Sequence, residues 1–226
     1  PESSHSCKPH FSNSYEQTKW EAEQLIEHRF GQMNIDILRP SIVAGNSLSG
    51  RIKEVNVLYI PLKLILQGLV KSLPAHPDNS LDVVPVDYLA KASIHILLNG
   101  RKESGSRIYH ICAGDKKSPA IDDIIRLTLH HLKPQVSSKI LAGMKYMPDY
   151  EALKTDFDES RNPHRVEQVI KAYEPYLLYQ RNFDISNLTK ELRGSGILLP
   201  DFSEYFKRTL DYAMQTRWGN HIVQAA

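Results

Sequence analysis

Strand-length apolar segments alternate with helix-length amphipathic segments along the first 132 residues of the chain. Strand patterns lie at residues 35–38, 81–86 and 107–112, and helix patterns lie at residues 15–30, 60–70, 88–98 and 118–132. The two sets differ in the period at which apolar side chains recur, which is the main sequence signal of secondary structure. Strands interleaved with helices are typical of an α/β fold with a mostly parallel sheet. The sequence therefore predicts that fold.

The segment after the first strand has the composition of a ligand-binding loop. The strand pattern ends at Arg39 and Pro40, and residues 41–50 contain two glycines and three serines. In open α/β sheets, ligands bind at the carboxyl ends of the strands. A second turn is predicted at residues 73–80, and Asp87 is predicted to cap the helix that follows it.

Beyond Lys133 and Pro134 the pattern becomes mostly helical. The segments at 165–173 and 202–218 show the clearest helical spacing. The sequence therefore predicts a helical region after the alternating part.

Composition and charge exclude several classes of protein. The chain of 226 residues has a formal net charge of +2, and its basic residues are scattered, so the charge pattern of a nucleic-acid-binding protein is missing. The longest apolar stretch, residues 55–70, is interrupted by Pro61 and Lys63, which argues against a membrane span. Cys7 and Cys112, the two cysteines, stand far apart, which favours a reducing compartment, by default the cytoplasm.

Tyr15 and Lys19 form the pair of residues with the clearest chemical meaning. They stand four residues apart on one helical face, where side chains are neighbours. A tyrosine has an ordinary pKa near 10, so a cation beside it is needed if it is to exchange a proton near neutral pH. The lysine is that cation, and its remaining donors suit a ribose hydroxyl.

The same spacing also occurs at Tyr59 and Lys63 and at Tyr150 and Lys154, so the spacing alone is weak evidence. Context favours the pair at Tyr15. There, an apolar-faced helix leads into a strand, then an Arg-Pro pair, then a glycine-containing loop.

Three blocks of the sequence resemble the extended short-chain dehydrogenase/reductase family in order and spacing. They are YEQTKWEAE at residues 15–23, ILRPSIVAG at 37–45 and VPVDYLA at 84–90. Within that family, the sequence of these blocks is most similar to the thioester reductase and fatty acyl reductase branch, whose members reduce carrier-bound or coenzyme A-bound acyl groups with NADPH. The segment at 176–187, with Tyr179 and Arg181, is also similar to that branch.

The resemblance implies both a fold and a set of roles. Residues 1–115 would be the C-terminal part of a Rossmann-type, doubly wound parallel sheet, and residues 116–226 a substrate-binding region. Tyr15 would protonate the carbonyl oxygen as hydride arrives, and Lys19 would bind the nicotinamide ribose and lower the tyrosine pKa. The expected cofactor is NADP, with NAD as the alternative, and the expected partner is an acyl carrier protein or coenzyme A thioester. The backbone expected beside the nicotinamide is that of Pro40, Ser41, Ile42 and Val43, and the residues expected to face substrate are Asn46 and Arg51.

Two parts of the family pattern are not found. The first is the glycine-rich turn G-x-x-G-x-x-G, which holds a pyrophosphate at a helix N-terminus. The second is the catalytic Ser or Thr, for which Ser3 is only a weak candidate. Both absences lead us to expect further sequence before Pro1. We then expect this chain by itself to turn over little, and the strand at 35–38 to present an open sheet edge.

Other interpretations stay open. A nucleotide-sugar epimerase or dehydratase shares the tyrosine, lysine and Arg-Pro blocks, and a non-catalytic scaffold could keep the fold. His5, Cys7 and His10 have the donor types of a zinc site, but they lack an evident fourth ligand and lie in a predicted loop, so no metal is expected. The tyrosines at 173, 176 and 179 are expected to pack in the core or a lid, with an acyl or pantetheine channel as the alternative.

Overall fold

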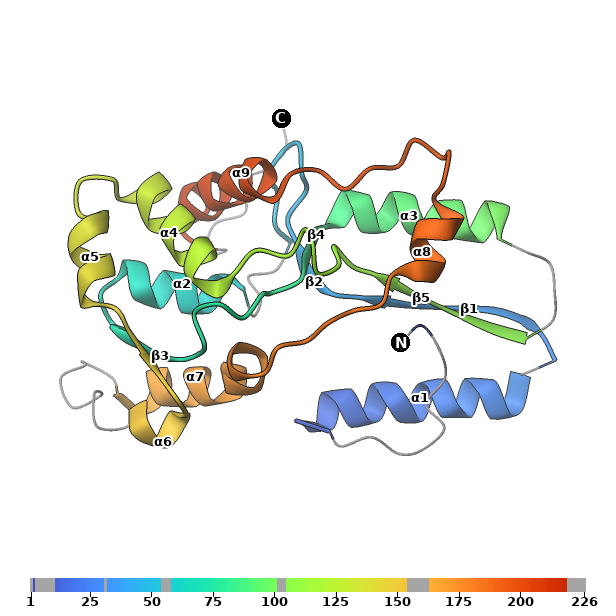
Figure 1. Cartoon of the computed structure of the whole chain (residues 1–226), viewed down its shortest axis with the longest axis horizontal. Helices are drawn as coiled ribbons and strands as arrows, with labels where there is room; N and C mark the ends of the chain where they lie inside the picture. The colour runs from blue at the N-terminus through green and yellow to red at the C-terminus, as the bar shows by residue number, and fades with distance from the viewer. Residues whose placement is uncertain are drawn as a thin grey trace.

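The computed structural model describes residue 2 and residues 11–30, 32–53, 58–100, 105–153 and 163–218. Figure 1 shows the elements in chain order. The helices are α1 (Ser14–Phe30), α2 (Tyr59–Leu66), α3 (Val86–Asn99), α4 (Ile121–Leu132), α5 (Ser137–Gly143), α6 (Tyr150–Leu153), α7 (Pro163–Leu178), α8 (Ser186–Glu191) and α9 (Phe202–Gln215). The strands are β1 (Asn34–Pro40), β2 (Ile42–Ala44), β3 (Ser72–Pro74), β4 (Val83–Pro85), β5 (Gly105–Ile111) and β6 (Lys145–Met147).

The strands pair in parallel. β1 pairs with β5 from Asn34 opposite Gly105 to Pro40 opposite Ile111. β2 pairs with β4, and β3 pairs with β6, also in parallel. Parallel neighbours need a crossover connection between them, which here contains helices. The predicted α/β fold with parallel strands is confirmed.

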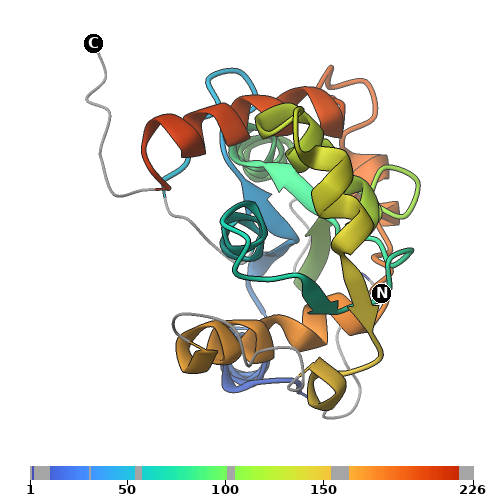
Figure 2. The same ribbon diagram turned by 90° about the vertical axis from the view of Figure 1, so that its left-hand side faces the viewer.

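The β1–β5 pair lies between two helices, with α3 along one face and α1 along the other (Figures 1 and 2). Successive residues of a strand point to opposite faces, so Leu38, Tyr109 and Ile111 point toward α3, where they join an apolar cluster with Ala92 and others. The residues between them point toward α1. No strand is hydrogen-bonded to the other edge of β1 within the described residues, in agreement with the predicted open edge.

A second apolar cluster fills the space between α2, α4, α7 and α9. Tyr59 stacks on Phe206, with ring centroids 6.3 Å apart, and both side chains are fully buried. Each of the two clusters combines residues from both sides of position 115. The division into residues 1–115 and 116–226 therefore stays a prediction. No described helix has the length and apolar character that crossing a membrane requires.

Some local predictions are wrong. The predicted loop at 41–50 contains β2, and the predicted turn at 73–80 overlaps the end of β3. Both strands are only three residues long and gain their hydrogen bonds from distant segments, so their own sequences carry little signal. The helix predicted to end at residue 173 continues as α7 through Pro175 to Leu178.

Candidate active site

The start of α1 is fixed by a side-chain cap. The Asn13 Oδ1 accepts a hydrogen bond of 2.9 Å from the backbone N–H of Glu16. No residue of α1 is buried, and Tyr15 is 64% exposed. The helix therefore lies at the rim of the molecule, with its first turn accessible.

Tyr15 and Lys19 lie together on this exposed turn. The Lys19 Nζ is 5.5 Å from the centroid of the Tyr15 ring, which is within the range of a cation–π contact. The structure thus brings these two predicted site residues together, one helical turn apart.

Polar contacts hold α1 against the sheet. Arg39 of β1 donates to the Glu23 carboxylate through Nε, 3.0 Å from Oε1, and through Nη2, 2.5 Å from Oε2. Both side chains are about one-fifth exposed. Ser106 of β5 donates to Glu27, at 3.1 Å. The position of the Tyr15 helix relative to the strands therefore depends on charge and hydrogen bonding more than on apolar burial.

The end of α7 and the loop after it contact the beginning of α1. The Asn13 Nδ2 donates to the Tyr176 hydroxyl at 2.9 Å, and the Arg181 Nη1 donates to Glu16 at 3.0 Å. The Arg181 guanidinium also lies 5.0 Å from the centroid of the Tyr176 ring. Spacing along the chain gives no signal for these contacts, because their partners are 163 and 165 residues apart. The similarity of segment 176–187 to the acyl reductases and the regularly spaced tyrosines at 173, 176 and 179 pointed to this region.

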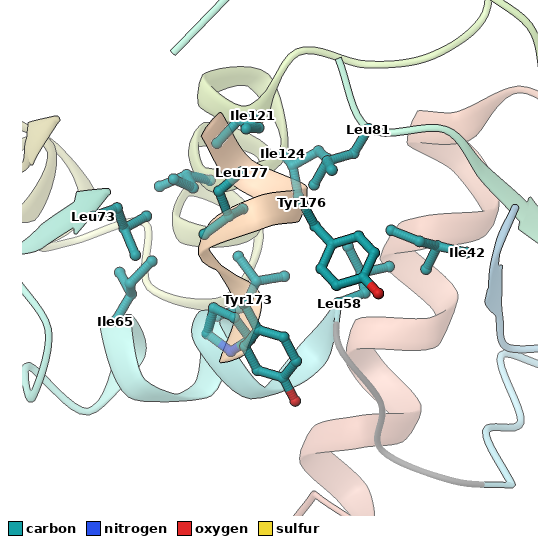
Figure 3. Close-up of a pocket in the computed structure, with 13 residues that line it drawn as sticks. Ile42, Leu58, Ile65, Leu73, Leu81, Ile121, Ile124, Tyr173, Tyr176 and Leu177 are labelled. Carbon is teal, nitrogen blue, oxygen red and sulfur yellow. The ribbon is translucent and has the colours of Figure 1, made fainter. Parts of the chain in front are cut away.

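An apolar cavity of about 40 Å³ lies beside Tyr176. Figure 3 shows Tyr176 and Ile42 at one end of it and Ile65 and Leu73 at the other. None of its lining residues is charged, and burial raises the pKa of Tyr173, so that phenol stays neutral. One hydrogen bond therefore joins the cap of the Tyr15 helix to a side chain that shares this cavity with Ile42.

The four residues predicted to lie beside the nicotinamide form the end of β1 and the start of β2. The Ser41 N–H donates to Ile111 and the Ile42 N–H donates to Asp82, so the sheet fixes this backbone. Pro40 is exposed, and Val43 is half-buried. Of these residues, Ile42 lines the cavity.

The loop with Asn46 and Arg51 lies elsewhere. Asn46 Oδ1 accepts hydrogen bonds from the N–H groups of Leu48 and Ser49, which closes a tight turn. The loop packs on α9, on the side of the molecule away from α1 (Figures 1 and 2). The structure does not bring Asn46 and Arg51 together with Tyr15, and their predicted contact with substrate stays a prediction.

Asp87 does not cap its own helix, contrary to the prediction. Pro85 occupies the N-cap position of α3. The Asp87 carboxylate instead accepts from the N–H and the hydroxyl of Ser47, both at 2.7 Å. Its role is to hold the loop after β2, because the α3 N-terminus faces that loop.

Among the described residues, the other candidates from the sequence do not form a competing site. Tyr59 is fully buried, and burial raises its pKa, so it serves the core and not proton transfer. Lys154 lies outside the described residues, as do Ser3, His5, Cys7 and His10. Within the described ranges, no group of three His, Cys, Asp or Glu side chains is placed to hold a metal ion. Burial raises the pKa of the Cys112 thiol far above its ordinary value, so this cysteine is not a nucleophile.

Parallel strands flanked by helices define a Rossmann-type domain, and α1, on one face of the β1–β5 pair, carries an exposed tyrosine and lysine. Solved structures have the same fold. The chain superposes on the terminal R domain of the myxalamid PKS-NRPS pathway with a TM-score of 0.66 and 19% identity, over 92% of this chain and 51% of that one. It superposes on a thiolation-reductase di-domain of an archaeal nonribosomal peptide synthetase with a TM-score of 0.62 and 19% identity, over 93% and 42%.

Sequence comparisons find relatives of the same kind. Residues 2–93 match the family model described as male sterility protein, an NAD-binding model. The chain is 26% identical over 192 residues to the nonribosomal peptide synthetase cpsA of Aspergillus campestris, covering 81% of this chain and 18% of that protein. It is 22% identical over 256 aligned residues to the chloroplastic fatty acyl-CoA reductase 2 of Arabidopsis thaliana, covering 94% and 40%. The resemblance to the extended short-chain dehydrogenase/reductases, in their thioester and fatty acyl reductase branch, is confirmed. The chain spans less than half the length of these relatives.

Proposed function

We propose that the protein containing this chain reduces an acyl thioester with a nicotinamide cofactor, and that Tyr15 is its proton donor. One observation carries the proposal: the Lys19 ammonium lies 5.5 Å from the Tyr15 ring on the exposed first turns of α1. The family match and the reductase relatives support the same chemistry. The proposed cofactor is NADP, with NAD as the alternative.

The residues present fit the nicotinamide-ribose end of such a cofactor. Tyr15 and Lys19 are exposed and offer a hydroxyl and an ammonium to ribose hydroxyls, and the backbone of residues 40–43 forms a strand end beside which a flat ring can lie. The eleven glycines of the chain include no glycine-rich turn for the pyrophosphate. This chain therefore accounts for one half of a dinucleotide site. A bound, reduced nicotinamide supplies the hydride.

Tyr15 performs the proton transfer in this proposal. The substrate carbonyl carbon gains a hydride, its oxygen takes the proton of the Tyr15 hydroxyl, and a hemithioacetal results. That adduct collapses to an aldehyde and the free thiol of the carrier. Lys19 places its ammonium 5.5 Å from the ring centroid, where it attracts the negative charge that the transfer leaves on Tyr15.

The thiol carrier is proposed to be an acyl carrier protein or coenzyme A. The archaeal structure similar to this chain joins a thiolation domain to its reductase, and the Arabidopsis relative is named for acyl-CoA. Both carriers present the acyl group on a long flexible arm, so the same exposed tyrosine suits either.

Replacing Tyr15 by Phe tests the proposal. Loss of the proton donor is expected to lower kcat by about 100-fold or more, because general acid catalysis contributes that much. The assay follows NADPH consumption with an acyl-pantetheine substrate, in the longest native form of the protein that carries these residues. Because Tyr15 is 64% exposed, the thermal midpoint is expected to stay the same.

Tyr212→Phe is the matched control, since Tyr212 belongs to α9 on the other side of the molecule from α1. It is expected to keep the wild-type rate. Equal rates for Tyr15→Phe and wild type would refute the assignment of the proton donor and favour a non-catalytic scaffold.

A further inference from the structure

The cavity beside Tyr176 is apolar and lies within the second apolar cluster. It lies between α2, α4 and α7, and its deep end is closed by Ile65 and Leu73, which are 1% and 2% exposed. Tyr176 and Ile42 stand at the other end (Figure 3), and the Tyr176 hydroxyl accepts from Asn13, the cap of α1. An apolar cavity of this kind takes an apolar group more readily than water.

The size of the cavity restricts its occupant. A cavity of about 150 Å³ lined by apolar side chains holds a benzene ring, which has six carbon atoms. The volume here is about 40 Å³, so it has room for roughly two carbon atoms. The buried residues at the deep end are closely packed, and lengthening the cavity would require them to move. A long fatty acyl chain therefore does not fit it.

We propose that this cavity binds the apolar end of a short acyl group, about three to five carbon atoms long including the thioester carbonyl. The inference rests on the proposed function, since the carbonyl must lie outside the cavity, at the end where Tyr176 contacts the cap of α1, to reach Tyr15. Counting about two carbons inside the cavity and the carbonyl with its neighbour outside gives that length.

Tyr176 couples this size selection to the catalytic helix. Its ring lines the cavity, and its hydroxyl accepts from Asn13, the residue that caps α1 two positions before Tyr15. Arg181 covers the Tyr176 ring and pairs with Glu16 on the same first turn. A chain too long for the cavity would press against Tyr176 and disturb the helix that carries the proton donor.

A chain-length series tests the inference. The probes are S-acyl N-acetylcysteamine thioesters with straight chains of increasing length, and kcat/KM is measured for each. The ratio is expected to rise about fourfold per methylene while the chain is being buried, and to fall once the cavity is full. The maximum is expected at about three to five carbons. A maximum at eight carbons or beyond would overturn the inference and leave the proposed reductase activity standing.

Leu73→Ala, which deepens the cavity, is expected to move that maximum to longer chains. Leu210→Ala is its control, because Leu210 is equally buried in the same core but does not line the cavity. It is expected to lose stability and keep the wild-type profile. If Leu73→Ala does not fold, the smaller change Leu73→Val serves, with a smaller expected shift.

Binding of the same probes without cofactor, measured by ligand-observed NMR, separates the two proposals. Selective binding of short chains together with an absence of reduction would support the cavity assignment and refute the proposed function. Reduction with no dependence of rate or binding on chain length would support the proposed function and refute the cavity assignment.

Discussion

Replacing Glu23 by Gln tests whether polar contacts alone hold the Tyr15 helix in place. Glu23 forms a two-pronged contact with Arg39 of β1, and no residue of α1 is buried. A hydrogen bond to a charged group contributes about 1.5–3 kcal/mol, and a neutral one about 0.5–1.5 kcal/mol. Removing the charge therefore costs about 2 kcal/mol for the pair, which corresponds to roughly 30-fold more frequent detachment of α1.

Amide hydrogen exchange measures that detachment directly. Peptides from residues 14–30 are expected to exchange roughly 30-fold faster in Glu23→Gln, while peptides from β5 and α4 stay unchanged. Glu21→Gln is the control: Glu21 accepts only from Gln17 on the same helix, among the contacts seen, and does not reach a strand. Equal protection of α1 in Glu23→Gln and wild type would show that some other contact positions the helix, and the reasoning would fail.

Three further substitutions test how the surrounding structure is held. Asp82→Ala is expected to lower the free energy of unfolding by about 3 kcal/mol in urea titrations, because the buried Asp82 carboxylate accepts two backbone N–H groups that would be left unpaired; a loss under 1 kcal/mol would contradict this. Gly50→Ala is expected to lower the thermal midpoint much more than Gly68→Ala. Both glycines have positive φ, but only at Gly50 would a Cβ overlap backbone, that of Arg208, so equal losses would argue against the overlap. Hydrogen bonds from Ser203 lower the pKa of Asp201, the cap of α9. The ionised Asp201 therefore stabilises the fold above about pH 4, and this stabilisation is lost as the pH falls through the lowered pKa. The difference in the free energy of unfolding between wild type and Asp201→Asn should shrink in that acidic range and not at higher pH.

The elements that could be predicted are those whose own residues carry the signal. α1, α3 and α9 are helices of 14 to 17 residues, and β1 and β5 are strands of seven residues each. β2 and β3 could not be predicted, since each has three residues and exists because a partner strand 41 or 73 positions later completes it: Ile42 pairs with Val83, and Ser72 pairs with Lys145. The intrinsic strand propensity of a short segment does not predict a strand that forms only through pairing with a distant segment.

The candidate site also has parts that could be predicted from the sequence and parts that could not. The Tyr15–Lys19 pair and its Asn13 cap follow from spacings of four and three residues, which a helix turns into neighbours. The contact of Asn13 with Tyr176 spans 163 residues and depends on where α7 comes to lie. The cavity cannot be predicted from the sequence, because its volume is the space that the surrounding apolar side chains leave unfilled.

The repeated spacing in this chain shows why a motif alone does not make a site. Tyr59 and Lys63 have the same separation as Tyr15 and Lys19, yet the Tyr59 hydroxyl accepts the Gly45 N–H at 3.1 Å inside the core. Burial raises the pKa of Tyr59, so its proton stays in place, and no substrate can reach it. Proton transfer needs a hydroxyl that is open to a ligand and a cation near it. On a helix with no buried residue, whose first turn is linked to an apolar cavity through Asn13 and Tyr176, Tyr15 and Lys19 meet both conditions, and that cavity is the place that we propose for the acyl group.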